Sequence, residues 1–203
     1  MTAIMSLGLG YLAGCINPAA WISQKKHVNL KEEGTGNLGA TNTAYVMGKK
    51  AGYFVLFFDV LKSYFSFKIA EWLFPKLLIA GILASIGCIL GHCFPVFLRF
   101  RGGMGLAAFG GMVLFYNPWF ALIILIPGVV LMVILNTGVV VPMLACVMFP
   151  ILVTCCHGSG MEILLSAVAS VFIAWMHRDN LRKALAGADV ISTKNFFKKM
   201  FHK

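Results

Sequence analysis

The chain is a succession of long apolar runs, separated by short joints that are polar or rich in glycine. Hydrophobic residues form 60% of its 203 residues and charged residues only 12%, which is too apolar for a soluble protein. Backbone groups in lipid must find partners within the chain, so the runs are predicted to be helices. The sequence therefore predicts an all-α integral membrane protein, with residues 1–203 as one membrane domain. The runs are 4–23, 52–74, 77–97, 106–116, 119–135, 139–156 and 162–176.

Two of these runs are irregular. Asn17-Pro18 lies near the end of the first, where the proline is predicted to bend the helix. The run 106–116 has only eleven residues, whereas crossing a hydrocarbon core of about 30 Å takes about twenty. If this short run crosses the membrane, the chain has about seven transmembrane helices. A tilted or re-entrant segment is the alternative.

Basic residues are unequally divided between the two sides of this arrangement. One side receives 14 of the 17 Lys and Arg residues, in segments 24–51, 98–105 and 177–203. Cytoplasmic loops collect Lys and Arg, so the N-terminus is predicted outside and the C-terminus in the cytoplasm, across the cell (inner) membrane. The formal charge of +10 then reflects orientation and contact with anionic membrane lipids, and no nucleic-acid partner is expected.

The tail 177–203 is polar and basic, and it is predicted to lie on the cytoplasmic side. Phe196, Phe197 and Phe201 are spaced to share one face of an amphipathic helix lying on the membrane surface.

Six cysteines are present, but none of their spacings is a CxxC pair. They predict neither a disulfide framework nor a zinc site, and no metal or cofactor is expected.

One joint has the composition of an anion-binding loop. It reads Gly-Thr-Gly-Asn-Leu-Gly-Ala-Thr-Asn over residues 34–42. Glycines let backbone N–H groups approach a ligand, and the small polar side chains add neutral donors, so a phosphate group is the expected guest. A solvated connector between two spans is the alternative. The residues expected to bind are Gly34, Thr35, Gly36, Asn37, Thr41 and Asn42.

Two further polar segments are predicted to reach the same membrane boundary. The second contains His92 and leads to the glycine cluster 102–105, and the third is His177-Arg-Asp-Asn180. One polar site at this boundary is the economical interpretation. Considered alone, His92 is typical of a hydrogen-bonded histidine at a helix end, and His177 is equally typical of an interfacial residue.

Asp59 and Lys62 lie within an apolar run at spacing i, i+3, and so they share one helix face. A buried unpaired charge costs about 3 kcal/mol at the bilayer centre, so this pair is expected to face the protein interior or a polar cavity. A structural ion pair and a role in the site are both compatible with this pattern.

These segments resemble the bacterial acyl-phosphate-dependent glycerol-3-phosphate acyltransferases, a family of seven-helix membrane enzymes that begin phospholipid synthesis. The resemblance covers nearly the whole chain and depends on three motifs. The first is 34–42 with Gly48 and Asp59-Val-Leu-Lys62, the second is Gly91-His-Cys-Phe-Pro95 with the glycines at 102, 103 and 105, and the third is 177–180 with Gly187.

The resemblance implies transfer of a fatty acyl group from acyl phosphate to a small hydroxyl acceptor, glycerol 3-phosphate, beside the membrane lipids. The donor's own phosphate takes the acceptor's proton, so no covalent nucleophile is implied. Thr35, His177 and Asn180 are the implied catalytic residues, and the loop 34–42 holds the donor phosphate. The acceptor site is implied at Tyr45, His92, Gly102, Gly103, Met104 and Gly105, and Asp59, Lys62 and Asp189 are implied to be structural.

Four positions depart from the family pattern. Thr35 replaces a serine and Asp189 a glutamate, which keeps the chemical group, but Tyr45 replaces an arginine and Met104 a lysine. The two lost cations suit the acceptor phosphate, and each charge-assisted bond contributes about 1.5–3 kcal/mol. The replacements predict weakened binding of glycerol 3-phosphate. They leave open a less anionic acceptor, or a non-catalytic lipid-binding relative.

Overall fold

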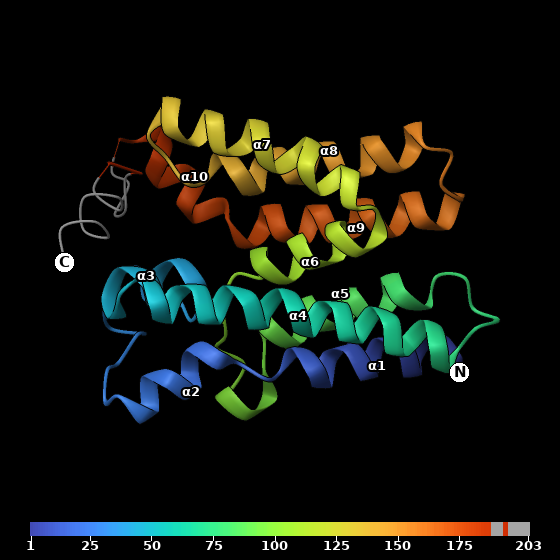
Figure 1. Ribbon diagram of the computed structural model, residues 1–203, viewed down its shortest axis with the longest axis horizontal. Coiled ribbons are helices and arrows are strands. Elements are labelled where there is room, and N and C mark those ends of the chain that lie inside the picture. Colours follow the sequence, from blue (N-terminus) through green and yellow to red (C-terminus); the bar gives the residue numbers. More distant parts are fainter. Residues whose placement is uncertain (188–192, 195–203) are drawn as a thin grey trace.

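The computed structural model describes residues 1–187 and 193–194, and within them the chain is helical with no β-strand. The helices form two layers with α6 between them (Figure 1). One layer contains α1, α2, α4 and α5, and the other contains α7, α8 and α9. The helices are α1 Thr2–Gly14, α2 Pro18–Lys25, α3 Ala40–Met47, α4 Lys49–Leu73, α5 Ala80–Cys93, η1 Val96–Leu98, α6 Leu106–Tyr116, α7 Pro118–Leu135, α8 Val140–Cys155, α9 Gly160–Met176 and α10 Arg178–Leu185.

Helices α1 and α5 pack backbone against backbone. A Cβ atom added to Gly10 or Gly14 would overlap the carbonyl of Ala84 or Cys88, and one added to Gly91 would overlap the carbonyl of Tyr11. Glycine at these positions therefore permits a separation that larger side chains would prevent, as is common between membrane helices. The close packing brings the end of α1 beside the part of α5 that carries the second motif.

The first predicted span is divided into two helices, whereas the sequence predicted only a bend. Helix α1 ends at Gly14, and α2 begins at Pro18. Proline suits the first position of a helix because it lacks the N–H that would be unsatisfied there, and the Asn17 side chain caps the new helix by accepting from Ala20 N at 2.9 Å. The carbonyls in the break need partners from elsewhere in the chain.

The third predicted run, 77–97, is also shorter as a helix. α5 ends at Cys93, and Pro95 precedes the short 3₁₀ helix η1. The chain then turns through Arg99 and Phe100, both in the left-handed region, and returns to the start of α6. The remaining runs match α4, α6, α7, α8 and α9 to within a few residues.

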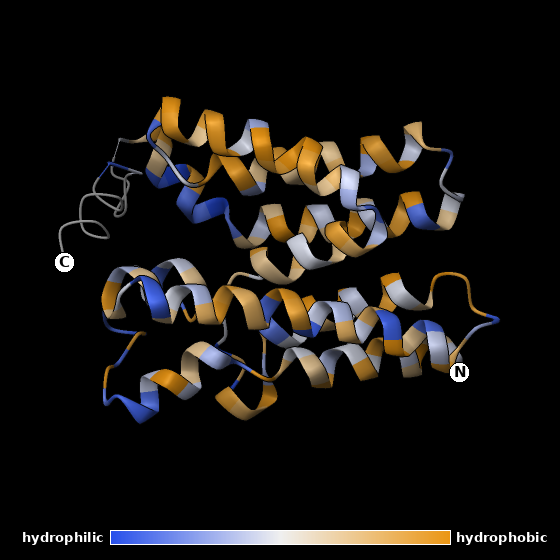
Figure 2. Cartoon of the chain, in the orientation of Figure 1, coloured by the Kyte–Doolittle hydropathy of each residue, from blue (hydrophilic) through white to orange (hydrophobic). Residues whose placement is uncertain are grey.

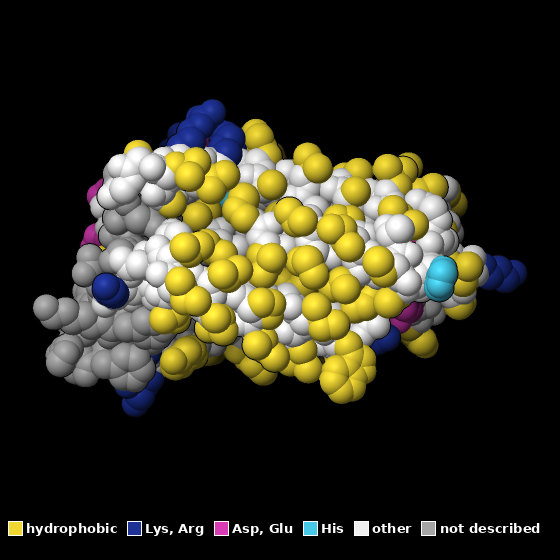
Figure 3. Space-filling view, turned by 90° about the horizontal axis from the view of Figure 1, so that it is seen from above, with side chains coloured by type: hydrophobic (Ala, Val, Ile, Leu, Met, Phe, Trp, Pro, Cys, Tyr) yellow, Lys and Arg dark blue, Asp and Glu magenta, His cyan; other side chains and the backbone are white. Residues whose placement is uncertain are grey.

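One hydrophobic core joins α6 to both layers, and the second layer presents an apolar outer face. Phe109 of α6 meets Phe149 of α8 edge to face, with ring centroids 5.7 Å apart. Figure 2 shows α7 as almost uniformly hydrophobic, whereas hydrophilic residues gather on α10 and near α2. The face seen in Figure 3 is covered by hydrophobic side chains, and its charged side chains lie toward the ends and edges. Such a face suits contact with lipid tails.

Among the described residues, three helical segments are long and apolar enough to cross a membrane: 2–25, 80–98 and 118–135. The pair α9 and α10, bent by 53°, makes a fourth if it is one span. Helices α6 and α8 are shorter apolar helices. The amphipathic helix predicted from Phe196, Phe197 and Phe201 lies outside the described residues.

Candidate active site

A cavity of about 620 Å³ lies where the two layers meet at the end of the molecule that holds α3 and α10. One part of its wall is polar, and the other is apolar and comes from α4, α6, α7 and α8. The polar residues are Thr35, Asn37, Thr41, Asn42, Asp59, His92, His177, Asn180 and Lys183. The apolar wall includes Leu56, Val60, Phe109, Val113, Leu122, Ile124 and Pro142.

The first motif is a loop held from inside by Asn42. This side chain is 1% exposed, and its Oδ1 accepts from Thr35 N at 2.8 Å. Its Nδ2 lies 3.0 Å from the carbonyls of Leu30 and Asn37 and 3.1 Å from that of Glu33. Both ends of this amide are bonded to the loop, so Asn42 holds the loop in shape, and its direct contact with a phosphate stays a prediction.

Two glycines allow the loop to close around this amide. Gly34 and Gly36 have φ of 63° and 72°, and a Cβ on Gly34 would overlap Asn42 Oδ1. The loop leads into α3, whose first residues, Ala40 and Thr41, line the cavity. Thr35, Asn37 and the N-terminal amides of α3 thus surround the polar end, which is a favourable setting for an anion.

The second motif supports the cavity mainly through its backbone. Gly102 N donates to Cys93 O at 3.0 Å, and Gly103 N donates to His92 O at 3.1 Å. A Cβ on Gly103 would overlap His92 Nε2, so only glycine fits beside this ring. Gly102 and Gly103 shape the segment behind the wall, while Met104 and Gly105 line the cavity itself.

The third motif and the rest of α10 supply three side chains over about two helical turns. His177 is buried, and its Nδ1 lies 2.9 Å from Ile173 O. A carbonyl can only accept, so Nδ1 carries the hydrogen and Nε2 keeps a lone pair. Burial lowers the pKa of His177 below its ordinary value, which keeps the ring neutral at pH 7. Asn180 and Lys183 follow it at intervals of three residues and line the same cavity.

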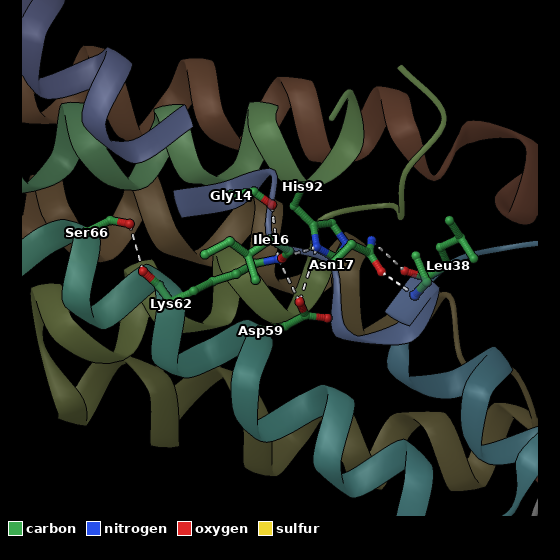
Figure 4. A network of polar contacts seen from close by, with 9 residues as sticks. Gly14, Ile16, Asn17, Leu38, Asp59, Lys62, Ser66 and His92 are labelled. Atoms are coloured by element: carbon green, nitrogen blue, oxygen red, sulfur yellow. Dashed lines mark hydrogen bonds and ion pairs between the residues drawn. The ribbon is translucent and has the colours of Figure 1, made fainter. Parts of the chain in front are cut away.

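Asp59, Lys62 and His92 form a buried cluster next to the cavity (Figure 4). Lys62 Nζ lies 2.8 Å from Asp59 Oδ1 and 2.9 Å from His92 Nδ1. It also donates to Ile16 O at 2.9 Å and Gly14 O at 3.3 Å, the carbonyls of the break between α1 and α2. The pair faces the protein interior, as the sequence predicts, and Asp59 and His92 also line the cavity.

The structure brings most of the predicted site residues to this one cavity. Besides Gly102 and Gly103, three of them do not line it: Gly36, which is exposed, Lys62, which is buried beside Asp59 and His92, and Tyr45 of α3, which is half-buried. The acceptor-site role of Tyr45 stays a prediction. Asp189 lies outside the described residues. Lys183 was missed by the sequence reasoning, although its spacing from Asn180 places both on one helix face.

Comparison with known proteins identifies this arrangement. The family described as Glycerol-3-phosphate acyltransferase matches residues 4–187. The chain belongs to this family. Among its curated relatives, the glycerol-3-phosphate acyltransferase of Thermoanaerobacter sp. (strain X514) is 32% identical over 190 residues, covering 93% of this chain and 95% of the relative. The enzyme of the same name from Fusobacterium nucleatum subsp. nucleatum is 32% identical over 194 residues, covering 94% of this chain and 95% of the relative.

Two solved structures of the family share the fold. Both are crystal structures of PlsY (YgiH), an integral membrane glycerol 3-phosphate acyltransferase. The glycerol 3-phosphate form superposes with a TM-score of 0.86 at 28% identity, covering 93% of this chain and 94% of that chain. The lysophosphatidic acid form gives 0.85 at 26% identity, covering 98% of this chain and 100% of that chain. The chain therefore has the integral membrane fold of this acyltransferase family.

Proposed function

We propose that this protein transfers a fatty acyl group from acyl phosphate to glycerol 3-phosphate, giving 1-acylglycerol 3-phosphate and inorganic phosphate. The observation that carries this proposal is the cavity, in which all three motifs form a polar end and four helices form an apolar wall. Such a cavity suits substrates with an anionic head and a long hydrocarbon tail. Membership of the glycerol-3-phosphate acyltransferase family supports the same reaction.

The donor's phosphate lies against the first motif in this proposal. Thr35, Asn37 and Thr41 supply neutral donors, the first amides of α3 supply N–H groups, and Asn42 holds the loop in shape. The acyl chain extends along the apolar wall between α6 and the pair α7 and α8. Gly36 acts through the backbone conformation of the loop, because it does not reach the cavity.

The acceptor lies between the second and third motifs. Its hydroxyl is oriented by Asn180 and by the Nε2 lone pair of His177, and its oxygen attacks the acyl carbonyl carbon. The bond from that carbon to the phosphate oxygen breaks, and the released phosphate takes the hydroxyl proton. Lys183 is the cation on the described cavity wall that can pair with the acceptor's phosphate. Met104 supplies no charge there.

A less anionic alcohol is the second candidate acceptor. It is favoured by one observation: Met104 presents a thioether to the cavity at the position where the family resemblance implies a lysine. Lys183 favours glycerol 3-phosphate. Assays with both kinds of acceptor separate the two, and absence of turnover with any acceptor would support a non-catalytic lipid-binding relative.

The membrane arrangement belongs to the same proposal. Seven crossings place the N-terminus outside, and they place the loop 34–42, the segment 102–105 and α10 at the cytoplasmic face of the cell membrane. Tags at the N-terminus and after His157 are expected to be accessible in intact cells. Residues 34–50 and a tag after the last residue are expected to be protected, and an externally accessible C-terminal tag would contradict this orientation.

The reaction is tested with purified protein in lipid nanodiscs, acyl phosphate and glycerol 3-phosphate, with mass spectrometry of the lipid product. The expected product is 1-acylglycerol 3-phosphate. Asn37→Ala is expected to reduce turnover with every acceptor, because it removes a donor from the phosphate loop, whereas the exposed Asn29→Ala is the matched control. Normal turnover by Asn37→Ala would mean that the loop does not hold the donor.

A further inference from the structure

Lys62 Nζ joins three parts of the chain that are distant in sequence. Its partners are Asp59 on its own helix, the main-chain carbonyls of Gly14 and Ile16, and His92 Nδ1 on α5. The Lys62 side chain is 8% exposed and that of Asp59 is 1% exposed, so these contacts are shielded from solvent. The charges of Lys62 and Asp59 neutralise each other. The contact of Lys62 with His92 affects the site, because His92 lines the cavity.

The contact with Lys62 decides which nitrogen of His92 carries a hydrogen. An ammonium group has three hydrogens and no lone pair, so a distance of 2.9 Å to Nδ1 requires a lone pair on Nδ1. The competing arrangement has Nδ1–H donating to Asp59 Oδ1. The distance from Nδ1 to Asp59 Oδ1 is 3.3 Å, which is long for a charge-assisted hydrogen bond. This arrangement would also turn an N–H group toward the ammonium of Lys62. A lone pair on Nδ1 places the ring hydrogen on Nε2.

The Nε2 edge of the ring faces the glycine segment. A Cβ on Gly103 would overlap Nε2, and Gly103 N donates to His92 O, so the segment lies against the ring. His92, Met104 and Gly105 all line the cavity next to this contact. An Nε2–H group here is an uncharged donor against the glycine segment, next to the side of the cavity proposed for the acceptor.

We infer that Lys62 is a positioning residue, which holds His92 as its Nε2–H tautomer and so places an uncharged donor beside the acceptor side of the cavity. His177 has the opposite tautomer, because its Nδ1–H is occupied by Ile173 O and its Nε2 keeps the lone pair. One histidine then donates to the acceptor and the other accepts from it. This inference rests on the proposed function only for its kinetic consequence, since the tautomer is a property of the protein without substrate.

The tautomer is measured by NMR of protein labelled with ¹⁵N-histidine in lipid nanodiscs at pH 7 without substrate, with His92→Gln to assign the signals. The wild type is expected to show a bare Nδ1 and a protonated Nε2. In Lys62→Met the lone pair loses its partner beside the Asp59 carboxylate, so Nδ1 is expected to become protonated. Asp59→Asn retains the ammonium and is expected to keep the wild-type tautomer. A protonated Nδ1 in the wild type, or a bare Nδ1 in Lys62→Met, would overturn the inference.

The kinetic measurement compares Lys62→Met with Lys68→Met. Lys68 pairs with Glu71 at the same i, i+3 spacing and the same 2.8 Å on the same helix, but it is exposed. We expect Lys62→Met to lower kcat/KM for glycerol 3-phosphate about tenfold, the value of one hydrogen bond, and Lys68→Met to leave it unchanged. Equal kinetics in both variants, with the Lys62→Met tautomer changed, would refute the positioning role.

The two measurements separate this inference from the proposed function. If the wild type fails to acylate glycerol 3-phosphate, the proposed function fails while the tautomer result stands. If Lys62→Met does not fold, the wild type and Asp59→Asn still test the assignment of the hydrogen.

Discussion

Asn180 Nδ2 lies 3.3 Å from the sulfur of Met104, so the third motif contacts the glycine segment through a weak hydrogen bond to a thioether. Both residues line the cavity, and neither is charged. At this position the family resemblance implies a lysine, which would place an ammonium group within reach of the acceptor's phosphate. We therefore expect Met104 to make the affinity for glycerol 3-phosphate lower than in a family member that has the lysine at this position.

Met104→Lys tests this directly. Methionine and lysine have similar length, and the side chain faces a cavity, so we expect the ammonium to be accommodated beside the acceptor's phosphate. One charge-assisted bond should lower the KM for glycerol 3-phosphate about tenfold or more. Met104→Leu, which adds no charge, is the control and should leave the KM unchanged. An unchanged KM in Met104→Lys would mean that the phosphate binds elsewhere.

Lys183 is the residue expected to hold the acceptor's phosphate in the native protein. Lys183→Met should raise the KM for glycerol 3-phosphate about tenfold or more, because it removes a charge-assisted contact. Arg182→Met is the matched control, since Arg182 is the adjacent cation but pairs with Asp179 and does not line the cavity. Equal effects of the two variants would point to general surface charge instead of a specific contact.

Asn42 is expected to act through the shape of the donor loop. Asn42→Ala removes the partner of the Thr35 N–H and a donor to the carbonyls of Leu30, Glu33 and Asn37, of which Glu33 O keeps the Gly36 N–H. This should lower the free energy of unfolding by about 1–3 kcal/mol and raise the KM for acyl phosphate. Chemical denaturation in detergent and donor titrations measure the two effects. Asn29→Ala, which removes one exposed hydrogen bond, should do neither.

Gly110 tests the apolar wall as the site of the acyl chain. It lines the cavity, and no atom lies within 4 Å of a Cβ added there, so a larger side chain would occupy cavity space without disturbing the helices. Gly110→Leu should shift the preference toward shorter acyl phosphates by about tenfold. Gly8 on α1 is equally open and lies away from the cavity, so Gly8→Leu should keep the wild-type preference. An identical chain-length profile in both variants would place the chain elsewhere.

Much of the fold could be predicted from the sequence because hydrophobicity alone determines which segments become helices in a membrane. The run 106–116 is a helix within the predicted bounds. Asn17-Pro18 predicted a bend but not the full break between α1 and α2, in which the carbonyls of Gly14 and Ile16 accept from Lys62 of a distant helix. No local pattern reveals where an interrupted helix finds partners for its carbonyls.

The candidate site was predicted in outline and not in detail. Three polar segments were expected at one boundary, and they line one cavity. The role of Asn42 could not be predicted, because an amide side chain can face a ligand or its own loop with equal chemistry. The position of Tyr45 relative to the cavity could not be predicted either, because a short helix can turn one residue toward a cavity and its neighbour away. Lys183 could have been found from its three-residue spacing after Asn180.

Acyl transfer to glycerol 3-phosphate is tested most directly by one comparison of acceptors. Purified wild-type protein in nanodiscs is given acyl phosphate with glycerol 3-phosphate, with glycerol, or with no acceptor, and phosphate release is followed. We expect release to depend on glycerol 3-phosphate, to be at least about tenfold slower with glycerol, which cannot pair with Lys183, and to match the amount of acylated product. Release that is equally fast with glycerol, or that does not respond to glycerol 3-phosphate, would contradict the account.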